Sequence, residues 1–152
     1  QAAWRLVDGD KGRMMNNIKN IFDVVGQSMG AQMVRLNTIA SNLANMESKA
    51  STPEEAFKPI RPVFQTVFSD QYENDGMASV TADEIVALER EAEKLYEPGH
   101  PNADADGFVY KAPINSDEEM VEMMEASRQY QNNLEVLSTM RALMMRTIDM
   151  GK

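Results

Sequence analysis

The stretch NIKNIFDVVGQSMGAQMVRLNTIASNLANMESKA, Asn17 to Ala50, decides the fold. Its apolar residues recur at steps of three or four, which is the period of an α-helix with one apolar side and not the period of a strand. A helix of this kind cannot bury its apolar side alone, so it needs a second helix or another chain. The residues of this stripe that we expect to pack between helices are Ile18, Phe22, Val25, Met29, Leu36 and Leu43.

A second amphipathic stretch, Ser116 to Met150, lies near the C-terminal end of the sequence. Its apolar residues follow an imperfect heptad pattern that Arg141 interrupts, and Ser116 with Glu119 matches a capping box at its start. We expect the two stretches to pair as a coiled coil, and ordinary core helices of a small bundle are the alternative. The packing residues predicted here are Met120, Met123, Tyr130, Leu134, Leu137, Met144 and Ile148.

The centre of the chain has a different composition. Short apolar runs interrupted by Pro59 and Pro62 favour edge or irregular strands, and a dense turn signal covers Glu97 to Pro101. The predicted fold is therefore mainly α with a small β-rich insert, in which long terminal helices flank an extended centre. The expected segments are a flexible N-terminal extension (1–14), a first helix (15–50), the insert (51–115) and a second helix (116–152).

Composition excludes several classes of function. The net charge is −9, and no basic face is available to neutralise phosphates, so nucleic acid is not expected as a partner. The chain has no cysteine, which removes disulfides and thiolate metal sites. No apolar run reaches the roughly 18 to 20 residues that span a bilayer, so we expect no membrane-spanning segment.

Catalytic, cofactor and metal sites are not expected either. His100 is the only histidine, which excludes sites built from several imidazoles. Asn102, Asp104, Asp106 and Gly107 match the opening of a calcium loop, but Pro113 stands where the bidentate glutamate is needed. The chain is therefore not expected to be an enzyme.

Three parts of the sequence resemble the axial proteins of the bacterial flagellum. The first helix carries Ser41, Asn42, Leu43 and Asn45, which is similar to the N-terminal signature of rod and hook subunits. The more selective match is in the centre, where Tyr96 to Tyr110 resembles the central motif of proximal rod proteins of the FlgC type. Its residues include Pro98, Gly99, His100, Pro101, Asp104 and Gly107. The stretch from Asn115 to Leu143 is similar to the C-terminal helix of that family.

This resemblance implies a structural subunit of the flagellar basal-body rod. Such a subunit is exported by the flagellar type III apparatus without a cleaved signal, assembles helically in the periplasmic rod and transmits torque from motor to hook. The implied partners are other copies of itself, neighbouring proximal and distal rod proteins, and the export apparatus. The alternative function is a cytoplasmic helical adaptor or export chaperone.

Overall fold

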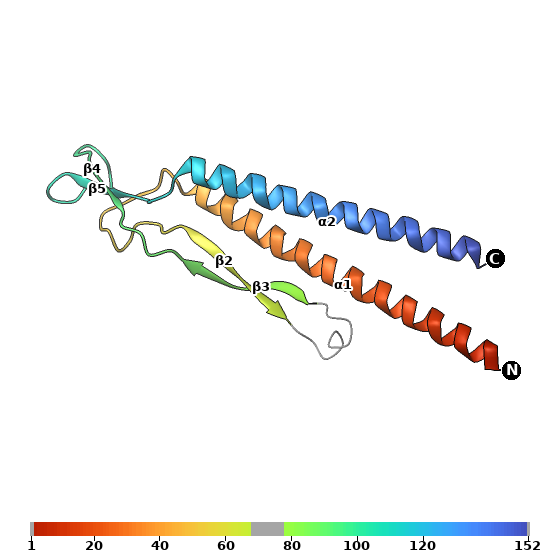
Figure 1. Cartoon of the computed structure of the whole chain (residues 1–152). Helices are drawn as coiled ribbons and strands as arrows, with labels where there is room; N and C mark the ends of the chain where they lie inside the picture. The colour runs from red at the N-terminus through yellow and green to blue at the C-terminus, as the bar shows by residue number, and fades with distance from the viewer. Residues whose placement is uncertain (1, 68–77, 152) are drawn as a thin grey trace. The chain divides into compact units, whose positions relative to one another are not determined.

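The computed structural model describes residues 2–67 and 78–151, and a series of short strands lies between its two long helices in chain order (Figure 1). The elements are α1 (Ala2–Ala44), β1 (Lys49–Ala50), β2 (Ile60–Val67), β3 (Ser79–Ala87), β4 (Glu93–Tyr96), β5 (Phe108–Lys111) and α2 (Ser116–Met150). The predicted architecture of N- and C-terminal helices flanking a small antiparallel sheet region is confirmed.

The chain forms two compact units. The helical unit comprises residues 1–32, 64–81 and 128–152, and the sheet unit comprises residues 33–63 and 82–127. Each unit thus contains a segment of α1 and a segment of α2. In the helical unit, the Asn133 side-chain amide donates a hydrogen bond to Ser28 Oγ at 3.0 Å, which joins the two helices through polar groups.

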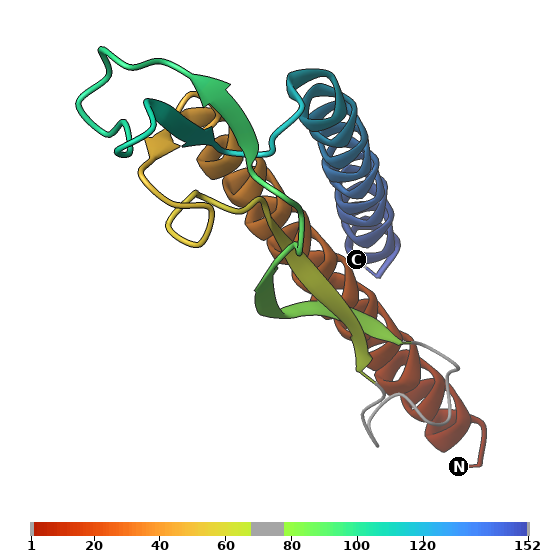
Figure 2. The same ribbon diagram turned by 90° about the vertical axis from the view of Figure 1, so that its left-hand side faces the viewer.

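A three-stranded antiparallel sheet in the order β1-β5-β4 lies in the sheet unit. The register places Ala50 and Lys94 on either side of Tyr110. Val109, on the opposite face of β5, is fully buried and belongs to the core. Strands β2 and β3 form a separate two-stranded sheet, seen from another side in Figure 2.

The bounds of α1 differ from the expected first helix. It begins at Ala2, so the helix also covers residues 2–14, where an extension was expected. It ends at Ala44, and Lys49–Ala50 is a strand. The early end has a local cause, because the Asn45 side chain donates to the Ser41 carbonyl at 2.8 Å and competes with further helical hydrogen bonds.

The expected capping box at the start of α2 is wrong. The residue that caps the helix is Asn115, whose Oδ1 accepts hydrogen bonds from the backbone N–H groups of Asp117 (2.9 Å) and Glu118 (3.3 Å). Glu119 does not accept a hydrogen bond from the start of the helix, because its carboxylate accepts from Asn42 and Arg61 instead. Asp117, Glu118 and Glu119 still place negative charge in the first turn, where the helix dipole favours it.

Candidate functional site

A buried carboxylate organises the sheet unit. Glu119 of α2 is only 1% exposed, and its oxygens accept hydrogen bonds from both terminal nitrogens of Arg61, one of them at 3.0 Å. The Asn42 side-chain amide also donates to Glu119, at 3.2 Å. This bidentate, charge-assisted arrangement is the geometry in which a carboxylate tolerates burial.

Asn42 joins α1 to β2 at the same point. Its side-chain oxygen accepts from the backbone N–H of Ile60 at 2.9 Å, and its side-chain amide donates to the Ile60 carbonyl at 3.0 Å. Asn42 is fully buried, and it therefore behaves as a side-chain substitute for a strand partner. We call Asn42, Arg61 and Glu119 the polar clamp; it fixes the end of α1, the start of β2 and the first turn of α2.

Two further arginines, Arg35 and Arg90, form ion pairs with carboxylates of α2. Arg35 donates to Glu122 at 2.6 Å, and its guanidinium lies 3.4 Å from Glu125, so these charged side chains join α1 to α2. Arg90 donates to both oxygens of Glu118, at 2.9 and 2.7 Å. The hydrogen bonds from Arg90 hold the pKa of Glu118 below its ordinary value of 4.5; partial burial opposes this, and the positive charges of Arg90 and Arg61 assist.

The turn between β4 and β5 contains most of the central sequence motif. Asp104 Oδ1 accepts from the backbone N–H groups of Asp106 (3.0 Å) and Phe108 (2.8 Å), so this carboxylate closes a loop of its own chain. His100 Nδ1 accepts from the N–H of Asn102 at 3.0 Å. The residues that suggested the opening of a calcium loop are therefore turn-forming residues, and no group of three potential metal ligands occurs within the described residues.

Gly107 is the one motif residue whose backbone requires glycine. Its φ is +87°, and a Cβ there would lie 2.9 Å from Tyr96 Cε2 and 3.1 Å from Pro98 Cβ. The remaining motif residues are less constrained: Pro98, Gly99 and Pro101 are exposed, and His100 is half-buried.

An ion pair joins the turn to β1, because Lys49 Nζ lies 2.8 Å from Glu97. The hydrogen bond from Lys49 lowers the pKa of Glu97 below 4.5.

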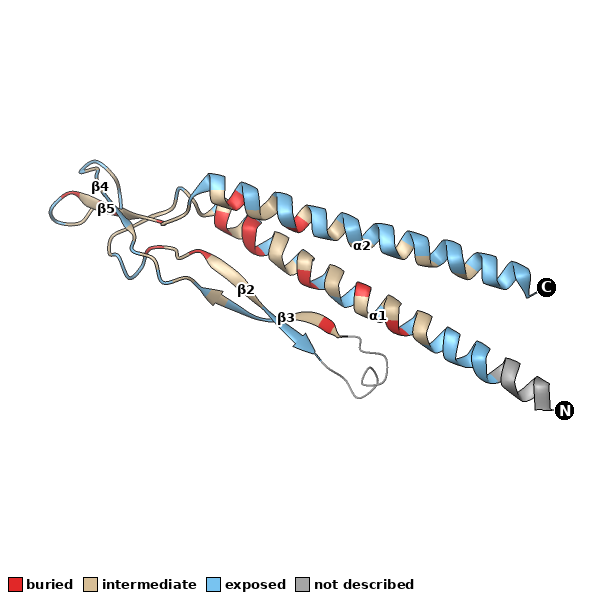
Figure 3. Ribbon diagram, in the orientation of Figure 1, coloured by how far each residue is buried: buried red, intermediate tan, exposed pale blue. Residues whose placement is uncertain are grey.

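The helix residues predicted from the sequence fall into two groups by burial. Figure 3 shows that most of α2 is exposed and that its buried positions are few. All six on α1 are at least half-buried, and Val25 is buried. On α2, the structure places Met123, Tyr130, Leu137 and Met144 in half-buried positions at strict seven-residue spacing. By contrast, it leaves Met120 (55%), Leu134 (45%) and Ile148 (54%) exposed.

Sequence reasoning missed the other inward positions of α2. Glu119 and Ala126 are buried, and Asn133 and Met140 are half-buried, again seven residues apart. Glutamate and asparagine carry no hydrophobic signal and alanine only a weak one, so the apolar pattern selected Met120 and Leu134, the exposed neighbours of Glu119 and Asn133. Met140 is apolar but was not among the predicted residues. Arg61 was missed as well, because its partner Glu119 is 58 residues away in sequence.

Exposed apolar side chains also form a small groove in the helical unit. The groove has a volume of about 230 Å³, and its lining residues come from the two ends of the chain: Lys11, Met14, Met15, Ile18, Met144, Thr147, Ile148 and Gly151. Three of the predicted packing residues, Ile18, Met144 and Ile148, therefore line one groove. No helix within the described residues is long and apolar enough to cross a lipid bilayer.

Known proteins of the bacterial flagellum are similar to this chain along most of its length. The family model described as flagellar basal body rod FlgEFG protein C-terminal matches residues 105–150, which run from the β4–β5 turn to the end of α2. The flagellar basal-body rod protein FlgC of Salmonella typhimurium is 37% identical over 133 residues, covering 88% of this chain and 97% of that protein. FlgC of Aquifex aeolicus is 38% identical over 143 residues, covering 91% and 100%.

The chain belongs to the FlgC family. A further relative, FlgC of Yersinia enterocolitica, is 35% identical over 136 residues, covering 90% of this chain and 99% of the relative. Proteins named FlgC are rod proteins of the flagellar basal body, so the family is one of structural proteins of that assembly and not of enzymes. The alternative of a cytoplasmic adaptor or export chaperone is not favoured.

Proposed function

We propose that this chain is a structural subunit of the proximal rod of the bacterial flagellum. The observation that carries the proposal is its 37% identity to a basal-body rod protein along 97% of that protein's length. In this role the chain assembles helically in the periplasmic part of the basal body and transmits torque from the motor to the hook. Export by the flagellar type III apparatus is part of the same proposal, and the family membership supports it.

Exposed apolar side chains support an assembling subunit. Besides Met120, Leu134 and Ile148, large apolar side chains are exposed on α1 at Met14, Met15 and Met33 and on α2 at Val121, Met124, Val136, Leu143, Met145 and Met150. This number of large exposed apolar side chains on two helices supports a contact with other protein chains. The proposed partners are other copies of the chain and neighbouring proximal and distal rod proteins, and the contacts are of the head-to-tail kind that builds an open helical assembly.

The spacing of the buried and half-buried residues of α2 supports the proposed coiled coil. Among the buried and half-buried positions of α2, positions 119, 123, 126, 130, 133, 137, 140 and 144 alternate steps of four and three, which is the a/d spacing of a heptad repeat. The half-buried positions 118, 122 and 127 each lie next to one of these positions in sequence. In this arrangement the inner seam pairs α2 with α1, and Met120, Leu134 and Ile148 are left for neighbouring subunits. In this proposal the two rod helices are α1 (Ala2–Ala44) and α2 (Ser116–Met150), and the segment between them is the insert.

Deleting residues 116–152 in cells tests the function. The truncated chain lacks α2, so rods should not assemble, hook protein should not be exported, and cells should not swim. Electron microscopy of isolated basal bodies and assay of hook protein in the culture medium measure both outcomes. Rods that assemble without these residues would refute the proposed role.

Point substitutions test the interface without removing an element. Leu134→Glu combined with Ile148→Glu places charge on exposed positions, so the helicity of the purified chain should be retained while incorporation into basal bodies falls. The matched control is Gln131→Glu with Thr139→Glu, two exposed polar positions of the same helix. Equal incorporation of both variants would show that Leu134 and Ile148 are not intersubunit residues.

A further inference from the structure

Asn133 and Leu134 are adjacent on α2, but the polar residue faces α1 and the apolar residue is exposed. Asn133 is half-buried, and its side-chain amide donates a hydrogen bond to Ser28 Oγ at 3.0 Å. Leu134 is 45% exposed. Successive residues of a helix are about 100° apart, so a rotation of α2 that buried Leu134 would carry Asn133 outward. The hydrogen bond to Ser28 therefore opposes the burial of Leu134.

The same arrangement occurs two heptads earlier, in the sheet unit. Glu119 is buried with its carboxylate bound to Arg61, whereas its neighbour Met120 is exposed. Residues two heptads apart lie on the same side of a heptad-patterned helix, so Met120, Leu134 and Ile148 belong to one exposed apolar side of α2. In each unit, a polar residue with a partner inside the fold lies next to a residue of this side.

Paired carboxylates hold α2 on the other side of its seam. Glu118, Glu122 and Glu125 are spaced by four and three residues, so they lie along one side of the helix. Arg90 donates to Glu118, and the Arg35 guanidinium lies 2.6 Å from Glu122 and 3.4 Å from Glu125. These ion pairs oppose the same rotation of α2 in the sheet unit, because each of them would be broken by it.

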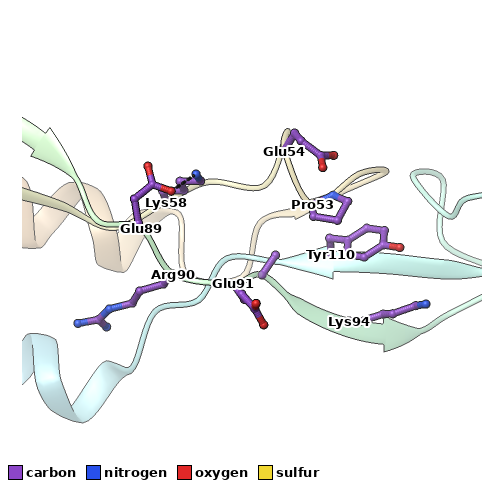
Figure 4. Close-up of a pocket in the computed structure, with 9 residues that line it drawn as sticks. Pro53, Glu54, Lys58, Glu89, Arg90, Glu91, Lys94 and Tyr110 are labelled. Atoms are coloured by element: carbon purple, nitrogen blue, oxygen red, sulfur yellow. Dashed lines mark hydrogen bonds and ion pairs between the residues drawn. The ribbon is translucent and has the colours of Figure 1, made fainter.

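Arg90 reaches α2 from the edge of a groove of about 600 Å³ in the sheet unit (Figure 4). The groove is also lined by Lys58, Glu89 and Tyr110, and the Arg90 side chain extends away from the Tyr110 ring. Lys58 Nζ pairs with Glu89 at 3.0 Å. Arg90 instead donates to both oxygens of Glu118, so this side chain serves α2 and not the groove.

Apolar packing alone discriminates weakly between rotations of α2 in the helical unit. The other seam positions there are Tyr130, Leu137, Met140 and Met144, and two of these four are methionines, whose flexible side chains fit irregular gaps. A polar residue in such a seam selects one arrangement of the helices at a cost in stability. The hydrogen bond of Asn133 adds a requirement that only one rotation meets.

From these contacts we propose that Ser28 and Asn133 are positioning residues for assembly. Their hydrogen bond sets the rotation of α2 about its own axis in the helical unit and thereby keeps Leu134 on the surface. An inward amide without a partner is unfavourable, because it gives up its hydrogen bonds to water and gains none. The inference rests on the proposed function, in which Leu134 contacts a neighbouring subunit.

Cysteine labelling of the purified chain measures this rotation. The chain has no cysteine, so single reporters can be placed at Met140 and Arg141, seven residues beyond Asn133 and Leu134. Met140 is half-buried and Arg141 is exposed, so Arg141→Cys should react with a maleimide faster than Met140→Cys. Ser28→Ala leaves Asn133 without its acceptor. The ratio of the two labelling rates should then fall about fivefold, which corresponds to the loss of one hydrogen bond.

A second substitution separates positioning from stability. Asn133→Leu added to Ser28→Ala removes the unpartnered amide, so the ratio should return to its original value although the hydrogen bond is still missing. Ser28→Thr keeps a hydroxyl group and should leave the ratio unchanged. Ser138→Ala, the same change at an exposed position of α2, is the matched control. An unchanged ratio in Ser28→Ala, or no recovery on adding Asn133→Leu, would overturn the inference.

Incorporation into isolated basal bodies separates the two possible failures. Ser28→Ala should lower incorporation, and adding Asn133→Leu should restore it. If the labelling ratio does not respond to Ser28→Ala while the unaltered chain is present in rods, the inference fails and the rod function stands. If the unaltered chain is absent from the rods, the proposed function is wrong and the positioning role for assembly falls with it.

Discussion

At the residue scale, the fold depends on a few polar side chains that are buried with their partners. Glu119, Asn42 and Arg61 satisfy one another and the backbone of Ile60, so three segments far apart in sequence are fixed at one point. An unpaired carboxylate at the position of Glu119 would have a high desolvation cost, so the three residues act as a unit.

Removing one partner of the polar clamp should therefore be costly. Arg61→Met leaves Glu119 buried without its cation, and we expect a loss of about 3 kcal/mol in the free energy of unfolding measured in urea. The double variant with Glu119→Met should recover part of this loss, because the buried charge is gone. Lys58→Met is the control, since Glu89 is 86% exposed and such pairs contribute about 0–1 kcal/mol. Similar losses for Arg61→Met and Lys58→Met would contradict this role.

A second residue-scale prediction concerns Gly107. Gly107→Ala forces a Cβ into a left-handed backbone and against the Tyr96 ring, so the free energy of unfolding should fall by about 1–3 kcal/mol. Gly99→Ala in the same turn meets nothing within 4 Å and should change stability much less. Urea titration of both variants measures the difference, and a harmless Gly107→Ala would refute the requirement for glycine.

At the element scale, periodicity predicted both helices but only part of the inward face of α2. Spacing alone identified Met123, Tyr130, Leu137 and Met144, which are half-buried. The sequence could not reveal that the other inward positions hold Glu119, Ala126 and Asn133, because polar and small residues give no hydrophobic signal. Their burial depends on partners such as Arg61 and Ser28, which only the folded chain brings close.

Helix ends and turns were predictable only in part. Proline and glycine marked the β4–β5 turn, but the capping roles of Asn115 and Asp104 depend on which side chain reaches a free N–H group. Several residues in each segment were chemically able to do so. The groove beside Tyr110 gave no sequence signal, because its walls come from three separate segments.

The ion pair between Glu118 of α2 and Arg90, which precedes β4, should make the stability of the fold depend on pH. Because Arg90 lowers the pKa of Glu118 in the folded state, the carboxylate stabilises the fold above its ordinary value of 4.5. This contribution is lost as the pH falls below 4.5 through the lowered pKa. The difference in stability between the chain and Glu118→Gln should therefore shrink over that range. Glu135→Gln, at an exposed position of α2, is the control; a difference that stays constant with pH would refute the link.

At the scale of the whole molecule, two properties oppose each other during assembly. Exposed apolar side chains on both helices favour association, whereas a net charge of −9 makes copies of the chain repel one another. The acidic residues are concentrated between positions 70 and 106, with 11 carboxylates and two basic side chains. Purified chain should therefore stay dissociated until its charge is screened or a partner of opposite charge is present.

Salt should shift this balance toward association. The screening length falls from about 10 Å at 0.1 M to about 3 Å at 1 M ionic strength, so repulsion between copies is largely removed while the apolar contacts remain. We expect the association constant, measured by sedimentation equilibrium, to rise at least about tenfold across this range. Leu134→Glu with Ile148→Glu should stay monomeric at both ionic strengths, because the apolar contact itself is lost. Association that weakens as salt is added would show instead that attraction between charged groups holds the copies together.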